Sequence, residues 1–516
     1  MILEYLVSFI PILVPFVLLV VFRMSAKSGM SISMLLIMMG GYFLWGITID
    51  VLTGAVFIGL HKTITILLIL FGALTLVNTL KNTMAIKRIN EGFMSITKDK
   101  RLLSVIIVFL FGGLIEGASG FGTPATITGP LLVSIGFNPF IAAVLALIGD
   151  STSVSFGAVG TPLVVGLQGT GASYSGVANA ITLIDLFSGV FVPLMISVMY
   201  IIVSKQKDKF RSIKEIVPWT LYVGVLYTVL AFISSRIVGF EFVSIVTPIV
   251  TIMIVSYTTM KGFLVPHYEP IQIEKNETSL IKAWSPYIVV VLLLIISRII
   301  GPIEELLKGL DFLSLTNVLG TGLSSSFSIF YSPGFILLIA AVFASYYQTG
   351  KMGAVIQAMK DTKGVIIGAT LALIPTLIMV TIFTSSGMNI NGLVSMPEYI
   401  AAGMSNVFGE FWSFGSTYLG MIGSFISGSA TVSNLTFAPI QVEIAATVGL
   451  STTFILASQV LGAAIGNMIC VHNVVAASYV VGLENQEGSI IKKTIITAMI
   501  YATIVTIVTS LLILIF

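Results

Sequence analysis

Runs of apolar residues long enough to cross a lipid bilayer recur from one end of this chain to the other. A transmembrane helix needs about 20 predominantly apolar residues, and residues 2–22 and 495–516 are two such runs. Only 9% of the 516 residues are charged, whereas soluble chains carry roughly 25%. So few charges cannot cover a soluble core. We therefore predict an all-α polytopic membrane protein with about 12–16 transmembrane segments.

The small numbers of cysteine and histidine residues exclude several classes of site. The chain has one cysteine, Cys470, and three scattered histidines, His61, His267 and His472. These residues cannot form an internal disulfide framework or a metal cluster. Basic residues lie mainly in short loops, as in cytoplasmic loops of inserted proteins. We predict no metal, no cofactor and no nucleic-acid partner. The lipid bilayer is an expected partner, and the sequence allows a homo-oligomer without specifying one.

The distribution of lysine and arginine divides the chain. Residues 102–204 contain neither, and residues 364–491 contain neither. Both blocks are rich in Gly, Ser, Thr and Pro within apolar surroundings. We predict five parts. They are N-terminal scaffold helices (1–101), a first substrate-binding block (102–204), scaffold helices with cytoplasmic loops (205–363), a second substrate-binding block (364–491) and a C-terminal helix (492–516).

The two blocks resemble each other. Each has a Gly/Ser/Thr turn, then a proline, a glycine and the tetrapeptide Val-Val-Gly-Leu: Pro130, Gly136 and 164–167 in the first block, Pro439, Gly449 and 480–483 in the second. Positively charged loops mark the cytoplasmic side, and on this criterion the two turns lie at opposite faces. This pattern predicts inverted repeats with discontinuous or re-entrant helices, and a substrate held between them near the midplane of the membrane.

Broken helices in a cation-free block favour an anion. A helix N-terminus carries free N–H groups and about half a positive charge, so it can bind a carboxylate without Arg or Lys. Neighbouring hydroxyl and amide groups add hydrogen bonds. The alternative is that small residues only let helices pack closely. The predicted substrate-binding residues are Gly120, Gly122, Thr123, Ser151, Thr152, Ser153, Gly160, Thr161, Ser429, Thr431, Ser433, Asn434, Asn467, His472 and Asn473.

Acidic residues inside these blocks are candidate proton carriers. Glu116 ends an apolar run just before the first glycine turn, and an ionised acid at a helix centre costs about 2.5–3.5 kcal/mol, so it is rare and usually functional. We predict proton coupling by Glu116 and Asp150. The alternatives are a permanently protonated Glu116 at a helix end and an Asp150 that caps a helix beginning at Ser151. Asp185 is expected near a membrane interface. For His472, the alternative to a substrate or proton contact is a structural role.

Two long motifs resemble the lactate permease family. Glu116-Gly-Ala-Ser-Gly-Phe-Gly-Thr-Pro124 is similar to its Glu-Gly-Ala-Ala-Gly-Phe-Gly-Ala-Pro signature, and Ser155-Phe-Gly-Ala-Val-Gly-Thr-Pro162 resembles its Ala-Phe-Gly-Ala-Val-Gly-Thr-Pro segment. The resemblance implies a symporter of the cytoplasmic membrane that moves L-lactate, D-lactate or glycolate with a proton. This chain departs from the family pattern at three positions: Ala430 replaces an acid, Asp150 replaces an asparagine and Asn467 replaces a lysine. These departures leave the substrate and coupling ion open.

We therefore predict a secondary active transporter that imports lactate, glycolate or a similar 2-hydroxy monocarboxylate by proton symport. A sodium-coupled carboxylate symporter is the alternative, with oxygen ligands from Ser433, Asn434 and Thr436. An ion channel suits the two broken blocks less well than alternating access does. An intramembrane enzyme is the least favoured class, because the chain lacks a His-Glu-x-x-His pair, a Gly-x-Ser-x-Gly elbow and a phosphate-binding Gly-Lys-Ser/Thr.

Overall fold

The computed structural model describes residues 2–22, 24–120, 122–168, 170–204, 208–266, 279–310 and 313–516. Within these ranges the chain is almost wholly helical and has no β-strand, which confirms the predicted all-α class. Eight helices in the described ranges are long and apolar enough to span a membrane, or up to 11 if each bent pair is one span. The sequence led us to expect about 12–16, and the difference arises because several apolar runs form shorter or broken helices.

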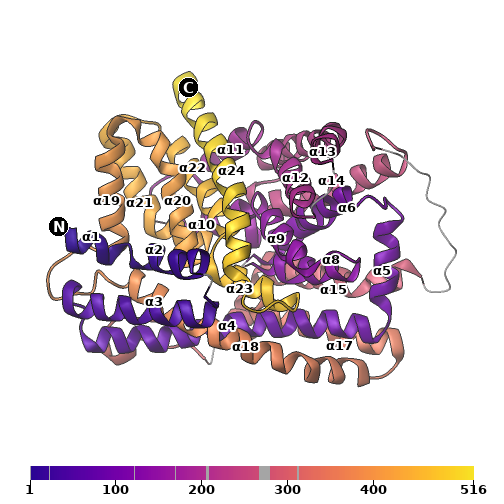
Figure 1. The fold of residues 1–516 in the computed structure, drawn as a ribbon, viewed down its shortest axis with the longest axis horizontal. Coiled ribbons are helices and arrows are strands. Elements are labelled where there is room, and N and C mark those ends of the chain that lie inside the picture. Colours follow the sequence, from indigo (N-terminus) through magenta and orange to yellow (C-terminus); the bar gives the residue numbers. More distant parts are fainter. Residues whose placement is uncertain are drawn as a thin grey trace.

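Four scaffold helices form one layer. They are α3 (Ala26–Gly40), α4 (Ile49–Asn82), α17 (Pro333–Thr349) and α18 (Gly353–Thr384), and they lie side by side along the lower edge of Figure 1. The Thr48 hydroxyl caps α4 by accepting from the Val51 N–H, as the free donors of a helix N-terminus require. Helix α18 continues through residue 363 without a break, so the predicted second block begins as part of a scaffold helix.

The other scaffold helices connect this layer to the two blocks. They are α1 (Ile2–Ser8), α2 (Ile10–Phe16), α5 (Ala85–Met94), α13 (Lys209–Ile237), α14 (Val243–Met260), α15 (Leu280–Ile299) and α16 (Gly301–Gly309). Helix α5 lies between α4 and the first block and contacts both α4 and α15. Helices α13 and α14 pack on each other, and α14 also packs on the first block.

The two blocks consist of shorter helices. The first contains α6 (Lys100–Ser104), η3 (Val105–Phe111), α7 (Gly112–Ser119), α8 (Thr123–Ser134), α9 (Pro139–Gly149), η4 (Ser153–Phe156), α10 (Gly157–Val164), α11 (Tyr174–Asp185) and α12 (Val192–Val203). The second contains α19 (Met396–Phe408), α20 (Trp412–Ser427), α21 (Ala430–Val448), α22 (Thr452–Asn467), α23 (Val471–Val480) and the beginning of the C-terminal helix α24 (Glu487–Ile515).

Two interruptions fall at corresponding places in the two blocks, and they confirm the predicted discontinuous helices. Gly120 (φ 64°) and Gly122 (φ 70°) separate α7 from α8, and Gly428 (φ 68°) separates α20 from α21. These left-handed conformations end a helix and favour glycine, which has no Cβ. A second interruption follows in each block, between α9 and η4–α10 with a bend of 52°, and between α22 and α23.

The repeated sequence features fall at equivalent places. Pro130 lies inside α8 and Pro439 inside α21. A glycine with positive φ follows each of these helices. The tetrapeptide Val-Val-Gly-Leu begins at the last residue of α10 in one block and at the last residue of α23 in the other. The order of helices and breaks is therefore the same in both blocks. The opposite orientation of the two blocks in the membrane stays a prediction.

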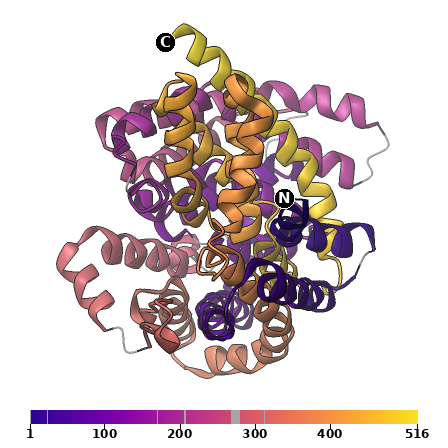
Figure 2. The same ribbon diagram turned by 90° about the vertical axis from the view of Figure 1, so that its left-hand side faces the viewer.

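The broken helices lie inside the protein. The spans Lys100–Ala118 and Thr452–Val480 are each 94% buried, whereas the other six candidate spans of the described ranges are 39–61% buried. Helix α10 packs on α21, α23 packs on α8 and α9, and α22 packs on η4. Figure 1 shows the two blocks meeting above the scaffold layer, and Figure 2 shows the same arrangement from the side of the second block. Irregular backbone at membrane depth needs such protein surroundings.

Candidate functional site

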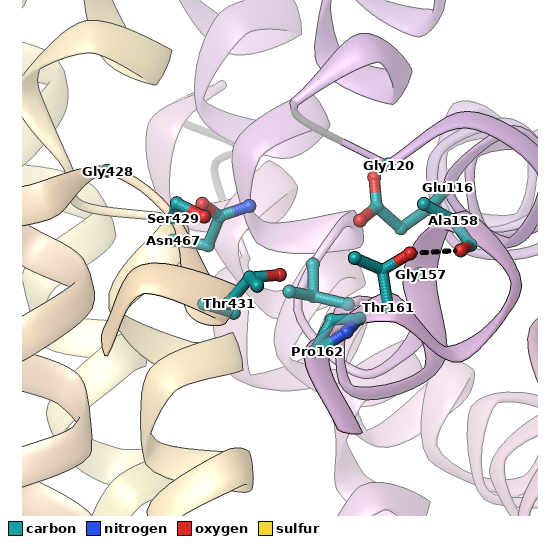
Figure 3. Close-up of a pocket in the computed structure, with 12 residues that line it drawn as sticks. Glu116, Gly120, Gly157, Ala158, Thr161, Pro162, Gly428, Ser429, Thr431 and Asn467 are labelled. Carbon is teal, nitrogen blue, oxygen red and sulfur yellow. Dashed lines mark hydrogen bonds between the residues drawn. The ribbon is translucent and has the colours of Figure 1, made fainter. Parts of the chain in front are cut away.

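A cavity lies where the breaks of the two blocks meet. The cavity is small, with a volume of about 20 Å³, which is room for about one water molecule. Figure 3 shows residues of the first block on one side and residues of the second block on the other. The lining residues are Glu116, Gly120, Val154, Gly157, Ala158, Thr161, Pro162, Gly428, Ser429, Ala430, Thr431 and Asn467.

A left-handed turn forms the first-block wall. Ala158 (φ 44°, ψ 53°), Val159 (φ 55°, ψ 45°) and Gly160 (φ 79°, ψ 13°) adopt left-handed conformations in succession. This conformation is a genuine outlier for a β-branched residue such as valine. The Thr161 hydroxyl donates to the Ala158 carbonyl at 2.6 Å and closes the turn (Figure 3). Strained backbone of this kind costs about 1–3 kcal/mol per residue and clusters at ligand sites.

The N-terminus of α21 forms part of the second-block wall. The Ser429 hydroxyl caps it by accepting from the Val432 N–H at 3.3 Å. Ala430 and Thr431, the first two residues of the helix, line the cavity. The first N–H groups of a helix have no acceptor within the helix, and they carry about half a positive charge. None of the described residues that line the cavity is a lysine or an arginine, so the N-terminus of α21 supplies positive potential to it without a basic side chain.

Two buried acids lie together beside the cavity. Glu116 is one turn before the α7–α8 break, and Gly157 faces it, so that a Cβ at residue 157 would collide with Glu116 Oε1. Asp150 directly follows α9. The two carboxyl groups are close enough to share a hydrogen bond when one is protonated. Glu116 Oε2 and Asp150 Oδ1 are buried and receive no hydrogen bond from the described residues. Asn467 Nδ2 donates to Asp150 Oδ2 at 3.3 Å.

The position of Asp150 excludes the capping role that was the alternative for it. It occupies the C-terminal end of α9 with helical backbone angles. The next helical turn, η4, begins at Ser153, and no side chain caps it. Asp150 therefore does not cap a helix that begins at Ser151. Its buried carboxyl group is left for the contacts with Glu116 and Asn467.

Asparagine side chains connect the breaks of the two blocks. Asn473 Nδ2 donates to Asn467 Oδ1 at 2.7 Å and to the Asn467 carbonyl at 3.1 Å. The Asn473 side chain also lies against Gly122, where a Cβ would collide with it. Asn467 in turn bonds to Asp150, although 317 residues separate them in the sequence. The α22–α23 break is thus joined to both breaks of the first block.

The structure separates the predicted residues into two groups. Glu116, Gly120, Thr161, Ser429, Thr431 and Asn467 line the cavity. The others lie around the breaks without lining it: Gly122, Thr123, Asp150, Ser151, Thr152, Ser153, Gly160, Ser433, Asn434, His472 and Asn473. His472 is buried against Gly428. His267, the second of the three histidines, lies outside the described residues.

Sequence reasoning missed a buried chain of hydrogen bonds that ends at this site. Trp412 Nε1 donates to Gln441 Oε1 at 2.6 Å, and Gln441 Nε2 donates to Gln459 Oε1 at 2.8 Å. Gln459 Nε2 then donates to Asn434 Oδ1 at 3.3 Å, and Asn434 Nδ2 donates to the Pro162 carbonyl at 3.0 Å. The chain connects the second block to the strained turn. Its sequence signal is one glutamine inside each of two apolar helices. Glutamine is uncharged, so it does not stand out in an apolar run as an acid does.

Known proteins resemble this chain over most of its length. The sequence matches the L-lactate permease family over residues 4–516. A putative L-lactate permease of Haemophilus influenzae is 35% identical over 429 residues, which cover 78% of each chain. The glycolate permease of Escherichia coli is 28% identical over 553 residues, which cover 99% of this chain and 95% of the relative. The L-lactate permease of Bacillus subtilis is 28% identical, with coverages of 82% and 80%.

One solved structure is a distant neighbour. The YdaH transporter of Alcanivorax borkumensis has 12% sequence identity and a TM-score of 0.31, with coverages of 86% and 84%, and so weak a likeness carries no argument. The sequence relatives are named permeases and not enzymes, which agrees with the predicted class. The family match over nearly the whole chain confirms the resemblance seen in the two motifs. This chain therefore belongs to the L-lactate permease family and is a multi-pass membrane transporter.

Proposed function

We propose that this protein imports lactate, glycolate or a similar 2-hydroxy monocarboxylate across the cytoplasmic membrane together with a proton. The observation that carries the proposal is the cation-free cavity between the two blocks, with the N-terminus of α21 on one side and Glu116 on the other. Names of the relatives support the substrate class, since they are L-lactate and glycolate permeases.

The substrate carboxylate would bind at the N-terminus of α21. The free N–H groups of Ala430 and Thr431, together with the Thr431 hydroxyl, are the donors available there. The Asn467 side chain lines the same cavity and offers a partner to the 2-hydroxyl group of the substrate. A carboxylate held by helix N–H groups needs no basic side chain, which accounts for the absence of lysine and arginine from the two blocks.

The Glu116–Asp150 pair would carry the proton. Two adjacent buried carboxylates repel each other when both are ionised, and no cation lines the cavity to offset that repulsion. A single shared proton gives Glu116 Oε2 and Asp150 Oδ1 the hydrogen bond that they otherwise lack. We propose that the pair is protonated when the substrate anion is bound, and that it releases its proton on the inner side. Movement of the two blocks relative to each other would then change the side from which the cavity is reached.

Hydrogen bonding argues against sodium at the residues first considered for it. Ser433 Oγ donates to the Gly420 carbonyl at 2.8 Å and accepts from Gln459 Nε2 at 3.2 Å. Asn434 Oδ1 accepts from the same nitrogen, and the Thr436 hydroxyl donates to the Val432 carbonyl at 2.8 Å. These oxygens already hold α20, α21 and α22 together, whereas the carboxyl pair has two oxygens, Glu116 Oε2 and Asp150 Oδ1, that receive no hydrogen bond from the described residues.

The test is uptake of labelled L-lactate, D-lactate and glycolate by purified protein in proteoliposomes. Gradients of pH and of sodium are imposed separately, so that each driving ion is tested alone. We expect accumulation against a concentration gradient when the outside is acidic, with or without sodium. Accumulation that follows the sodium gradient at constant pH would refute proton coupling. Absence of transport for all three acids would refute the substrate class.

A further inference from the structure

A third broken helix lies in the first block and holds a buried acid. Helices α11 and α12 form a bent pair with an angle of 51° at the break. Asp185 is the last residue of α11. The sequence led us to expect Asp185 near a membrane interface, but its side chain is buried in protein, with 7% of the residue exposed. The cavity described above does not include it.

Two hydroxyl groups hold the Asp185 carboxylate. Tyr501 on α24 donates to Asp185 Oδ1 at 2.9 Å, and the Ser188 hydroxyl, at the break, lies 3.1 Å from the same oxygen and 3.0 Å from the Ile184 carbonyl, its two acceptors. Gly189 leaves room for this carboxylate, because a Cβ at residue 189 would lie 3.1 Å from Oδ1. A buried acid held in this way at a helix break inside a transporter is typical of a proton-carrying site.

The groups that face Asp185 provide no positive charge. Helix α13 contributes the hydroxyl of Tyr227, and α24 contributes Tyr501. Arg236, also on α13, is exposed and donates to the Thr182 hydroxyl at 3.2 Å and to the Asn179 carbonyl at 3.3 Å. Helices α10 and α22, which also pack on α11, have no titratable residue. Asp185 itself lies at the C-terminal, negative end of α11.

A line of hydroxyl groups leads from Asp185 to the carboxyl pair. Tyr227 lies on α13, which packs on α11, and its hydroxyl is near Thr152 and within electrostatic range of Asp185. Thr152 Oγ1 is buried and has no hydrogen-bond partner among the described residues. It is two residues from Asp150, which neighbours Glu116. Buried polar groups of α13 and of the α9–η4 break therefore lie between the two acidic sites.

We propose that Asp185 is a second protonation site of the transport cycle and that the proton passes between it and the Glu116–Asp150 pair through Tyr227 and Thr152. This inference rests on the proposed proton symport. In each step a carboxyl O–H gives its proton to a hydroxyl oxygen, and that hydroxyl passes its own proton onward. The two hydroxyl groups end unchanged, one carboxyl group is left as an anion and the other has gained the proton.

The test measures proton and lactate fluxes together in proteoliposomes that contain a trapped pH-sensitive dye. The variants are Asp185→Asn and Tyr227→Phe. Matched controls are Asp361→Asn, an exposed aspartate on α18, and Tyr222→Phe, a tyrosine on α13 that bonds Thr258 instead. Lactate–lactate exchange, which needs only the loaded carrier, reports whether each variant folds and binds substrate. We expect exchange to persist in both variants, with proton-coupled net uptake lost in Asp185→Asn and slowed several-fold in Tyr227→Phe.

The outcomes separate this inference from the proposed function. An unchanged ratio of protons to lactate in Asp185→Asn, with normal wild-type coupling, would overturn the inference and leave proton symport intact. A wild-type protein that moves lactate without protons would overturn both. If Asp185→Asn does not fold, the variant Tyr501→Phe tests the role of Asp185 instead. Loss of its donor disfavours the Asp185 anion, so we expect the pH of half-maximal uptake to rise by about one unit. An unshifted profile would show that the tyrosine has only a structural role and would overturn the proposal.

Discussion

Replacing Glu116 by glutamine tests whether the carboxyl pair couples transport to protons. The change keeps the size and shape of the side chain, removes the titration of Glu116 and leaves Asp150 as the remaining acid of the pair. A glutamine amide also supplies an N–H donor toward Asp150 Oδ1, which receives no hydrogen bond from the described residues. Folding should therefore be maintained, since the amide imitates the protonated acid. Exchange of labelled for unlabelled lactate should also continue in the Glu116→Gln protein.

The expected accumulation of lactate follows from the number of protons that cross with each lactate anion. In the proposed mechanism the pair carries one proton, so one proton should cross with each lactate anion. A pH difference of two units is worth about 2.7 kcal/mol per proton, at 1.36 kcal/mol per unit. The wild-type protein should then accumulate lactate about 100-fold, independently of the membrane potential. Without a titrating pair the internal concentration should only equal the external one, a ratio of about 1.

The assay is uptake of labelled lactate into proteoliposomes, with the inside two pH units above the outside and the potential clamped at zero. The control is Glu443→Gln, which replaces an exposed acid on α21 and should accumulate lactate like the wild type. Accumulation by Glu116→Gln at the wild-type level would refute the role given to this residue. Accumulation that depends on membrane potential in the wild type would refute the one-to-one ratio.

Two further predictions concern the walls of the site. In Gly428→Ala the new Cβ meets the His472 ring at a left-handed position, so we expect about 1–3 kcal/mol of overpacking beyond the roughly 1–2 kcal/mol of backbone strain. Residue 449 is also left-handed but has open space around it, so Gly449→Ala carries only the backbone strain. In thermal unfolding in detergent, Gly428→Ala should therefore unfold at a lower temperature than Gly449→Ala. Trp412→Phe leaves Gln441 Oε1 buried without its donor, which should cost about 1–3 kcal/mol in chemical denaturation; a midpoint equal to the wild type would contradict this.

The sequence was sufficient for those features that depend on local composition. Low charge and long apolar runs predicted the membrane class, and the glycines at residues 120, 122 and 428 predicted where helices break, because left-handed backbone favours this residue. The repeated tetrapeptide indicated that α10 and α23 are equivalent. Glu116 could be selected because an acid stands out in an apolar run.

Features that depend on distant contacts could not be predicted. Nothing local indicates that Asn467 bonds to Asp150 across 317 residues, or that Gln459 holds Asn434 against the strained turn. The burial of Asp185 results from packing of α24, at the other end of the chain, which supplies Tyr501. The number of spans was also beyond sequence reasoning, since apolar runs alone do not distinguish a crossing helix from half of a broken one.

The most direct test of the central claim asks whether the substrate binds between the two blocks. Cysteines are placed on the two walls of the cavity by Thr161→Cys and Thr431→Cys, in a protein whose single native cysteine is replaced by Cys470→Ala. Thr447→Cys, at the far end of α21, is the control. We predict that lactate slows thiol labelling at both wall positions and leaves the control unchanged. Protection of neither wall, or of one wall only, would contradict a site shared by the two blocks.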